Sequence, residues 1–141
     1  KQVHVIVIND EEARLLSGES NLVKAVRAIR QMGPTRVVIK RGEHGVLMTQ
    51  GDGFFATPGF PLESVFDPTG AGDTFAGGFV GYLAAAADLS EEVFKRAVIC
   101  GSAMASLAVE DFGLARLLSL TDENIRARLD SFKRLTHFDA L

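Results

Sequence analysis

The run Val-His-Val-Ile-Val-Ile at residues 3–8 constrains the fold of this 141-residue chain more than any other segment. Its β-branched apolar residues do not alternate with polar ones, which is typical of a strand buried on both faces. A helix is predicted directly after it, because Asn9 is a good N-cap, Glu12 follows three residues later, and Gly18 is a typical helix stop. A buried strand joined at once to a helix favours a layered α/β fold.

The rest of the sequence continues this alternation of strands and helices. Residues 50–53, Gln-Gly-Asp-Gly, are typical of the turn of a β-hairpin. This alternation predicts a mainly parallel sheet, and the small number of strands indicates that one edge of the sheet lacks a partner. Besides residues 3–18, the predicted elements are a helix within 19–33, a second buried strand at 35–42, the hairpin at 44–59, a helix ending near 87, a helix at 90–109 capped by Ser90, and a helix capped by Thr121 with Asn124 at its third position.

Composition and charge exclude several classes of protein. A net charge of −3 without a basic run argues against nucleic acid and membrane surfaces as partners. No apolar run reaches the roughly 18 residues that a membrane span needs, and the first ten residues do not resemble a signal peptide. The single cysteine, Cys100, cannot form an internal disulfide, which favours a reducing compartment. A cytoplasmic protein is therefore expected.

Residues 67–79, Asp-Pro-Thr-Gly-Ala-Gly-Asp-Thr-Phe-Ala-Gly-Gly-Phe, carry the clearest chemical signal. A helix that starts near Asp73 after three small residues leaves backbone N–H groups free, which together with the helix dipole form an anion site. A carboxylate beside that site suits an acid that deprotonates an alcohol while the N–H groups hold a phosphoryl group. From these residues alone, a helix N-cap at Asp73 after a tight glycine turn is an equally good interpretation.

The longer string Asp-Pro-Thr-Gly-Ala-Gly-Asp-Thr-Phe-Ala-Gly-Gly-Phe-Val-Gly-Tyr-Leu-Ala resembles the C-terminal signature of the ribokinase-like (PfkB) carbohydrate kinases. Residues 9–12, 40–45 and 101–113 resemble three other stretches of that family, in the same order. The resemblance implies a three-layer α/β/α ribokinase-like fold. It covers essentially the whole chain but only the C-terminal half of the family's pattern, so residues 1–141 would form the nucleotide-binding half of a kinase domain.

The resemblance also implies how phosphoryl transfer from ATP would be divided among these residues. Asp73 would be the general base toward the acceptor hydroxyl, and Gly70, Ala71 and Gly72 would form the anion hole. Asn9 and Glu12 would organise the Mg²⁺ and phosphate water shell. Their spacing is also that of a capping box, and the two interpretations are compatible.

Further contacts follow from the same resemblance. Lys40, Gly42 and Gly45 would line the nucleotide, although glycines at a strand end are also common turn residues. Ser102 would lie near the adenine, where packing is an equally good interpretation. Asp67 and Thr69 match positions that bind a monovalent cation such as K⁺; the alternative is that they stabilise a turn. Main-chain oxygens near Ala108, Asp111 and Gly113 would complete that cation site.

The acceptor is open at this point, because sugar and nucleoside kinases of this family share these residues. A sugar is the first expectation and a nucleoside the second, while a nucleotide-binding fragment without turnover is the alternative from another class. The substrate-contacting residues and lid belong to the family's N-terminal half, so this chain alone is expected to be inactive. An unpaired strand edge would favour self-association, for example as a homodimer, or a partner segment over that edge.

Overall fold

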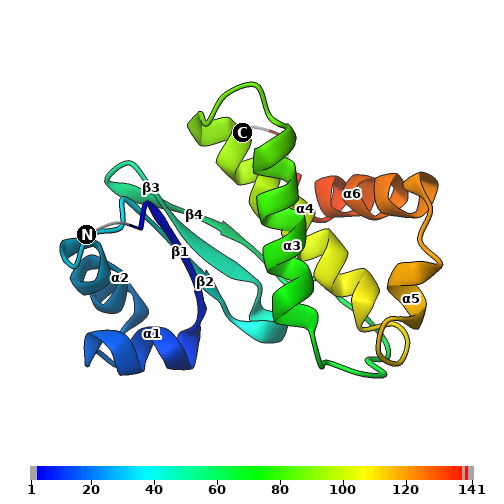
Figure 1. Ribbon diagram of the computed structural model, residues 1–141, viewed down its shortest axis with the longest axis horizontal. Helices are drawn as coiled ribbons and strands as arrows, with labels where there is room; N and C mark the ends of the chain where they lie inside the picture. Colours follow the sequence, from blue (N-terminus) through cyan, green and yellow to red (C-terminus); the bar gives the residue numbers. More distant parts are fainter. Residues whose placement is uncertain (1–2, 138, 140–141) are drawn as a thin grey trace. The chain divides into compact units, whose positions relative to one another are not determined.

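The computed structural model describes residues 3–137 and 139, and the chain divides into two compact units at Ala56 and Thr57 (Figure 1). The predicted kinase half, 1–141, therefore includes residues 1–2, 138, 140 and 141, which lie outside the described residues. The elements of the N-terminal unit and its sheet are β1 (Val5–Asn9), α1 (Asp10–Ser17), α2 (Leu22–Gln31), β2 (Arg36–Lys40), the short 3₁₀ helix η1 (Gly42–His44), β3 (Val46–Gln50) and β4 (Gly53–Thr57).

The four strands form one sheet in the order β1-β2-β3-β4. β1 pairs with β2 in parallel, whereas β2 pairs with β3 antiparallel, so the sheet is mixed and its parallel part is confined here to β1 and β2. The helices of residues 10–31 allow the parallel crossover, while the short connection through η1 returns the chain in the opposite direction. Among the described residues, β1 is therefore an edge strand.

The first strand, β1, is less buried than the sequence predicts. All five residues of β1 are only half-buried, although the sequence predicts a strand buried on both faces. The central residues of β2 (37–39) are fully buried instead, because β2 has neighbours on both sides. Among the described residues, the strand predicted at residues 3–8 is therefore an edge strand with partly covered faces.

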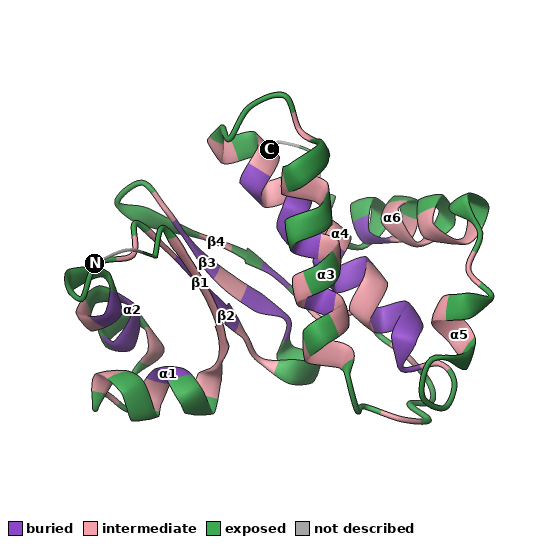
Figure 2. Ribbon diagram, in the orientation of Figure 1, coloured by how far each residue is buried: buried purple, intermediate pink, exposed green. Residues whose placement is uncertain are grey.

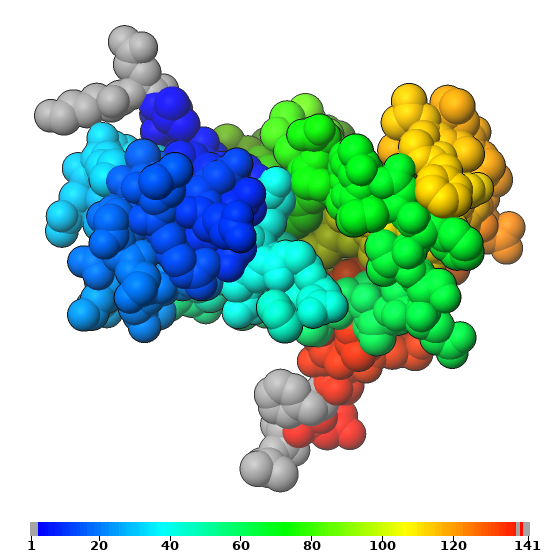
Figure 3. Space-filling model, turned by 90° about the horizontal axis from the view of Figure 1, so that it is seen from below, coloured from blue at the N-terminus to red at the C-terminus, as the bar shows by residue number. Residues whose placement is uncertain are grey.

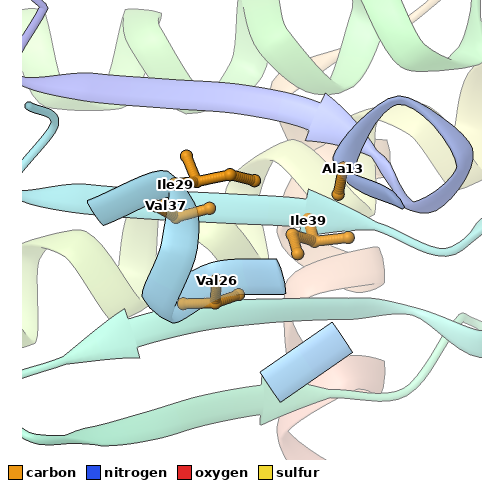
Figure 4. Packing of buried hydrophobic residues seen from close by; sticks show 5 residues of the cluster. All are labelled: Ala13, Val26, Ile29, Val37 and Ile39. Carbon is orange, nitrogen blue, oxygen red and sulfur yellow. The ribbon is translucent and has the colours of Figure 1, made fainter. Parts of the chain in front are cut away.

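Helices α1 and α2 cover one face of this sheet, and their outer surface is drawn in blue in Figure 3. α1 begins with the predicted capping box at Asn9 and ends at Gly18, whose φ of 71° is left-handed. α2 is capped by Asn21, whose side chain accepts the N–H groups of residues 23 and 24. The core between these helices and the sheet is shown in Figure 4; it contains Ala13, Val26, Ile29, Val37 and Ile39.

The C-terminal unit is helical, with α3 (Ala71–Ala85), α4 (Glu91–Ala108), α5 (Ala115–Leu118) and α6 (Asp122–Thr136). Thr121 and Asn124 form a capping box at α6, as the sequence predicts. Ser90 occupies the N-cap position of α4, but its side chain makes no capping bond. Asp88 instead accepts the Ser90 N–H at 2.9 Å, so the turn before α4 is held by the aspartate.

Helices α3 and α4 pack closely, and the buried residues lie along α4 in Figure 2. A Cβ added to Gly78 would lie 3.1 Å from the Gly101 Cα, so Gly78 permits this approach as expected. The same expectation is wrong for Gly77 and Gly81, where an added Cβ would meet nothing within 4 Å. Gly101 is the tighter position, because its Cβ would lie 2.7 Å from the Phe75 carbonyl oxygen. None of the helices in the described part of the chain has the length and apolar character to cross a membrane.

Candidate active site

Helix α3 begins at Ala71, two residues before Asp73, where the sequence predicts its start. Gly70 is its N-cap with φ 78° and ψ −2°, a left-handed conformation that glycine adopts without strain. A Cβ at Gly70 would meet nothing within 4 Å, so the backbone conformation rather than lack of room favours glycine there. Asp73 lies in the first turn of the helix, and the interpretation of Asp73 as the N-cap is therefore wrong.

The N–H groups at this helix start are only partly satisfied. The Ala71 N–H donates to the Pro68 oxygen at 3.2 Å, and the Thr74 N–H donates to the Gly70 oxygen at 2.8 Å. Within residues 3–137, no side chain caps α3, and the N–H groups of Gly70, Gly72 and Asp73 have no acceptor. Free N–H groups at the positive end of a helix fit an anion such as a phosphoryl group.

The Asp73 carboxylate itself is available for chemistry. It is exposed, and it makes no hydrogen bond or ion pair with any other described side chain. Its place in the first helical turn puts a proton acceptor beside the free N–H groups. This arrangement could bind a phosphoryl group and accept a proton from an alcohol next to it.

Asp67 connects the loop before α3 to the turn after α4. Its Oδ1 accepts the Thr69 N–H at 2.9 Å, and its Oδ2 accepts the Gly113 N–H at 3.2 Å. A backbone hydrogen bond also joins these two segments, since the Phe66 N–H donates to the Val109 oxygen at 2.9 Å. The Thr69 N–H, the Thr69 side chain and then the Gly113 N–H lower the pKa of the Asp67 carboxyl, because hydrogen bonds to the carboxylate favour its ionised form.

Among the residues expected at a cation site, Asp67 contacts Thr69 and Gly113. Ala108 ends α4, and Asp111 and Gly113 lie in the turn that Asp67 contacts. The Asp111 Oδ1 accepts the Phe112 N–H at 2.7 Å. The bonds of Asp67 are those of a turn-stabilising aspartate, and the cation role stays a prediction. Within the described residues there is no group of three or more His, Cys, Asp or Glu residues that could hold a metal ion.

A second set of predicted residues lies in the N-terminal unit. The Asn9 N–H donates to the Glu12 Oε2 at 2.7 Å, and the Glu12 N–H donates to the Asn9 Oδ1 at 2.7 Å. This confirms the capping box. Glu12 is exposed and uses one carboxylate oxygen in it, which leaves the other oxygen for the water shell of a Mg²⁺ ion.

The parallel register places Asn9 directly opposite Lys40, at the carboxyl ends of β1 and β2. Ligands of open α/β sheets bind beyond the carboxyl ends of the strands. The loop that follows Lys40 turns at Gly42 (φ 55°) and Gly45 (φ 83°, ψ −142°), conformations that favour glycine. The fold therefore accounts for both glycines, and their contact with a nucleotide stays a prediction.

Sequence reasoning missed Arg41, which holds this loop together. Its backbone N–H donates to the Gly45 oxygen at 2.8 Å, and its Nη2 donates to the His44 oxygen at 2.7 Å. Its Nε is buried without a partner among the described residues. A single arginine in a polar loop gives no sequence signal for such a role.

Ser102 lies on α4 and is 9% exposed. Its Oγ is buried and has no hydrogen-bond partner in the described part of the chain. This burial supports the packing interpretation of Ser102 and does not test a contact with adenine.

The sequence also matches a known protein family. The model of the pfkB family of carbohydrate kinases matches residues 1–120. The chain belongs to this family. The resemblance in residues 9–12, 40–45, 67–84 and 101–113 is thereby confirmed at the level of the family.

Individual relatives of this pfkB chain include kinases of sugars and of nucleosides. It is 41% identical over 81 residues to the cytidine kinase of Thermococcus kodakarensis, which covers 56% of this chain and 29% of the relative. It is 31% identical over 128 residues to the ribokinase of Haemophilus influenzae, which covers 87% of this chain and 40% of the relative. This pfkB chain thus spans less than half of the relatives' length.

The fold comparison gives the same result. A fructokinase from Vibrio cholerae O395, crystallised with fructose, ADP and calcium ion, matches with a TM-score of 0.81 and 26% identity, over 89% of this chain and 41% of that chain. The pfkB chain therefore has the ribokinase-like α/β fold that its sequence predicts.

Proposed function

We propose that this chain is the nucleotide-binding half of an ATP-dependent kinase that phosphorylates a hydroxyl group of a sugar. The observation that carries the proposal is the start of α3, where, among the described residues, the N–H groups of Gly70, Gly72 and Asp73 and the Asp73 carboxylate have no partner. Phosphoryl transfer needs mainly positioning and charge stabilisation, which backbone donors and one carboxylate can supply.

Some of these residues act on the phosphoryl group of ATP, and Asp73 acts on the acceptor hydroxyl. The free N–H groups at Gly70 and Gly72 stabilise charge on the transferring phosphoryl group, with the dipole of the 15-residue helix α3 behind them. Asp73 accepts the proton of the attacking hydroxyl. Ala71 contributes less to the anion hole than its neighbours, because its N–H donates to Pro68.

Residues of the N-terminal unit would hold the nucleotide. Asn9, Glu12 and Lys40 gather at the carboxyl ends of β1 and β2, beside the turn at Gly42 and Gly45. A Mg²⁺ ion bound with ATP would neutralise phosphate charge. The free oxygen of Glu12 suits its water shell, since carboxylates are preferred magnesium ligands. We also propose that Asp67, Thr69 and the turn at 108–113 can hold a monovalent cation such as K⁺.

A nucleoside is the second candidate acceptor. It is favoured by the cytidine kinase of Thermococcus kodakarensis, which has the higher identity over its shorter match. Phosphorylation of pentoses, hexoses and nucleosides by the complete gene product with Mg-ATP separates the two candidates. We expect turnover with a sugar; turnover with nucleosides alone would select the second candidate, and none with any acceptor would contradict kinase function.

Replacement of Asp73 by asparagine tests the assignment of the base. In the complete gene product, Asp73→Asn should lower kcat at least about 10³-fold and leave nucleotide affinity within a few-fold, since the proton acceptor is lost while the N–H groups remain. Asp122→Asn is a matched control, because Asp122 is also an exposed aspartate in the first turn of a helix. A normal kcat in Asp73→Asn would show that another group accepts the proton.

A further inference from the structure

Glu110 is the centre of a charged network between α4, α5 and α6. Its Oε1 accepts a hydrogen bond from the Arg128 Nη2, and its Oε2 accepts one from the Arg116 Nε at 3.1 Å. The side chains of Glu110 and Arg128 are only 25% and 13% exposed. Because charged hydrogen bonds strengthen away from water, this shared carboxylate fixes the end of α4 against α6.

Arg128 is held in one orientation by further contacts. Its Nη1 donates to the Ser106 Oγ at 2.7 Å, and its guanidinium lies 4.2 Å from the centroid of the Phe60 ring. Phe60 in turn packs against Phe132 of α6, with their ring centroids 5.2 Å apart. The planar guanidinium thus uses its edge for Glu110 and Ser106 and its face for Phe60, which a lysine could not do.

The network ends beside the candidate active site. Glu110 directly precedes the turn 111–113, and the Gly113 N–H of that turn donates to Asp67 at 3.2 Å. The other Asp67 oxygen accepts the Thr69 N–H, and Thr69 precedes the N-cap of α3, Gly70. Hydrogen bonds and short backbone segments therefore lead from Arg128 to the free N–H groups of α3.

We propose that Arg128 is a positioning residue for the anion hole. By holding Glu110, it fixes the turn 111–113, and this turn orients Asp67, which sets the backbone of Thr69 and Gly70. The consequence for catalysis rests on the proposed kinase function, whereas the coupling of Arg128 to Thr69 and Gly113 does not. A merely structural Arg128 would stabilise α4 against α6 without affecting the start of α3.

Local hydrogen exchange separates these two roles. In the complete gene product, Arg128→Gln should speed amide exchange at Thr69 and Gly113 at least about 10-fold, because opening at these bonds becomes easier, and leave the interior of α3 around Phe79 unchanged. The control is Arg126→Gln, since Arg126 is an exposed arginine of the same helix. Unchanged exchange at Thr69 and Gly113 in Arg128→Gln would overturn the proposal.

Kinetics supply the second readout. Arg128→Gln should lower kcat about 10-fold with the KM for the acceptor within about 2-fold, because a small misplacement of the anion hole affects the transition state more than binding. Arg128→Lys should restore part of the kcat at most, since it keeps the charge without the planar fork. Full activity of Arg128→Gln would overturn the proposal.

Three further outcomes keep the proposal falsifiable. If Arg128→Gln does not fold, Glu110→Gln replaces it, because the amide keeps the size of the side chain and removes the shared charge; the same exchange pattern is expected, and its absence counts against the proposal. If wild type phosphorylates no acceptor, the kinase function fails, and hydrogen exchange still decides the coupling. If Asp73→Asn is inactive while the Arg128 variants are normal in both readouts, the kinase function stands and the positioning role fails.

Discussion

At the scale of single residues, the hydrogen-bond partners of a side chain distinguish the residues of the candidate site from others of the same type. Asp67 and Asp88 are both aspartates that accept the N–H two residues later, in loops before helices. Only Asp67 also accepts an N–H from a distant turn, that of Gly113. The second bond links Asp67 to the turn after α4, whereas Asp88 holds its own turn.

The pH dependence of stability should reflect the hydrogen bonds that the Asp67 carboxylate accepts. The pKa of Asp67 lies below its ordinary value of 3.8, mainly because of the Thr69 N–H. A lowered pKa means that Asp67 stabilises the fold above about pH 4, and that this contribution disappears as the pH falls through the folded-state pKa. Urea unfolding should therefore show Asp67→Asn to be less stable than wild type at pH 7, with the difference shrinking toward pH 3.

Asp88→Asn is the control for the Asp67 experiment. It should show the same trend with pH, because the pKa of Asp88 is also lowered, chiefly by the Ser90 N–H. Amide exchange at Gly113 should increase in Asp67→Asn and stay normal in Asp88→Asn. A difference between Asp67→Asn and wild type that grows toward low pH would contradict the sign of this argument.

At the scale of elements, the contact between α3 and α4 depends on two glycines that face each other, Gly78 and Gly101. The cost of glycine in a helix, roughly 1 kcal/mol relative to alanine, is offset where it lets two helices approach. This offset does not apply at Gly77, where a Cβ would meet nothing within 4 Å. The glycines of α3 therefore differ in their effect on packing: Gly78 permits the close approach of α4, whereas Gly77 does not contribute to it.

Alanine substitutions should separate these glycines. Gly101→Ala should lower the free energy of unfolding by about 1–3 kcal/mol, because its Cβ would lie 2.7 Å from the Phe75 oxygen and force the helices apart. Gly77→Ala, the control in α3, should raise the free energy of unfolding by up to about 1 kcal/mol through helix propensity. Denaturant unfolding measures both; a stabilising Gly101→Ala would show that the helices can shift freely.

At the scale of the whole molecule, the chain spans 40% of the ribokinase relative and 41% of the fructokinase chain. Residues 1–141 alone should bind Mg-ADP weakly and phosphorylate nothing, because no acceptor would be held in line, and positioning supplies about 7–11 kcal/mol of barrier lowering. Titration calorimetry and a coupled assay over pentoses, hexoses and nucleosides check this. Robust turnover by these residues would place the acceptor site within them.

The same chain should self-associate. Among the described residues β1 pairs with β2 alone, and an unpaired edge strand favours pairing with another chain. Sedimentation analysis of residues 1–141 should therefore show a dimer or larger species. A monomer at high concentration would show that the edge is protected.

The sequence by itself determined the features that depend on neighbouring residues. The capping boxes at Asn9 and Thr121, the stop at Gly18 and the hairpin of β3 and β4 could be predicted because their interactions span only a few positions. The signature around Asp73 also identified the family, since it is a continuous string.

Only the tertiary structure decided which distant groups meet. Asp67 and Gly113 are 46 positions apart, and Glu110 and Arg128 are 18 apart, so no local pattern relates them. The N-cap at Gly70 and the half-buried edge strand β1 likewise depend on how the loop and the sheet are placed. Local rules act through backbone spacing along the chain, whereas these contacts depend on how helices and strands pack in space.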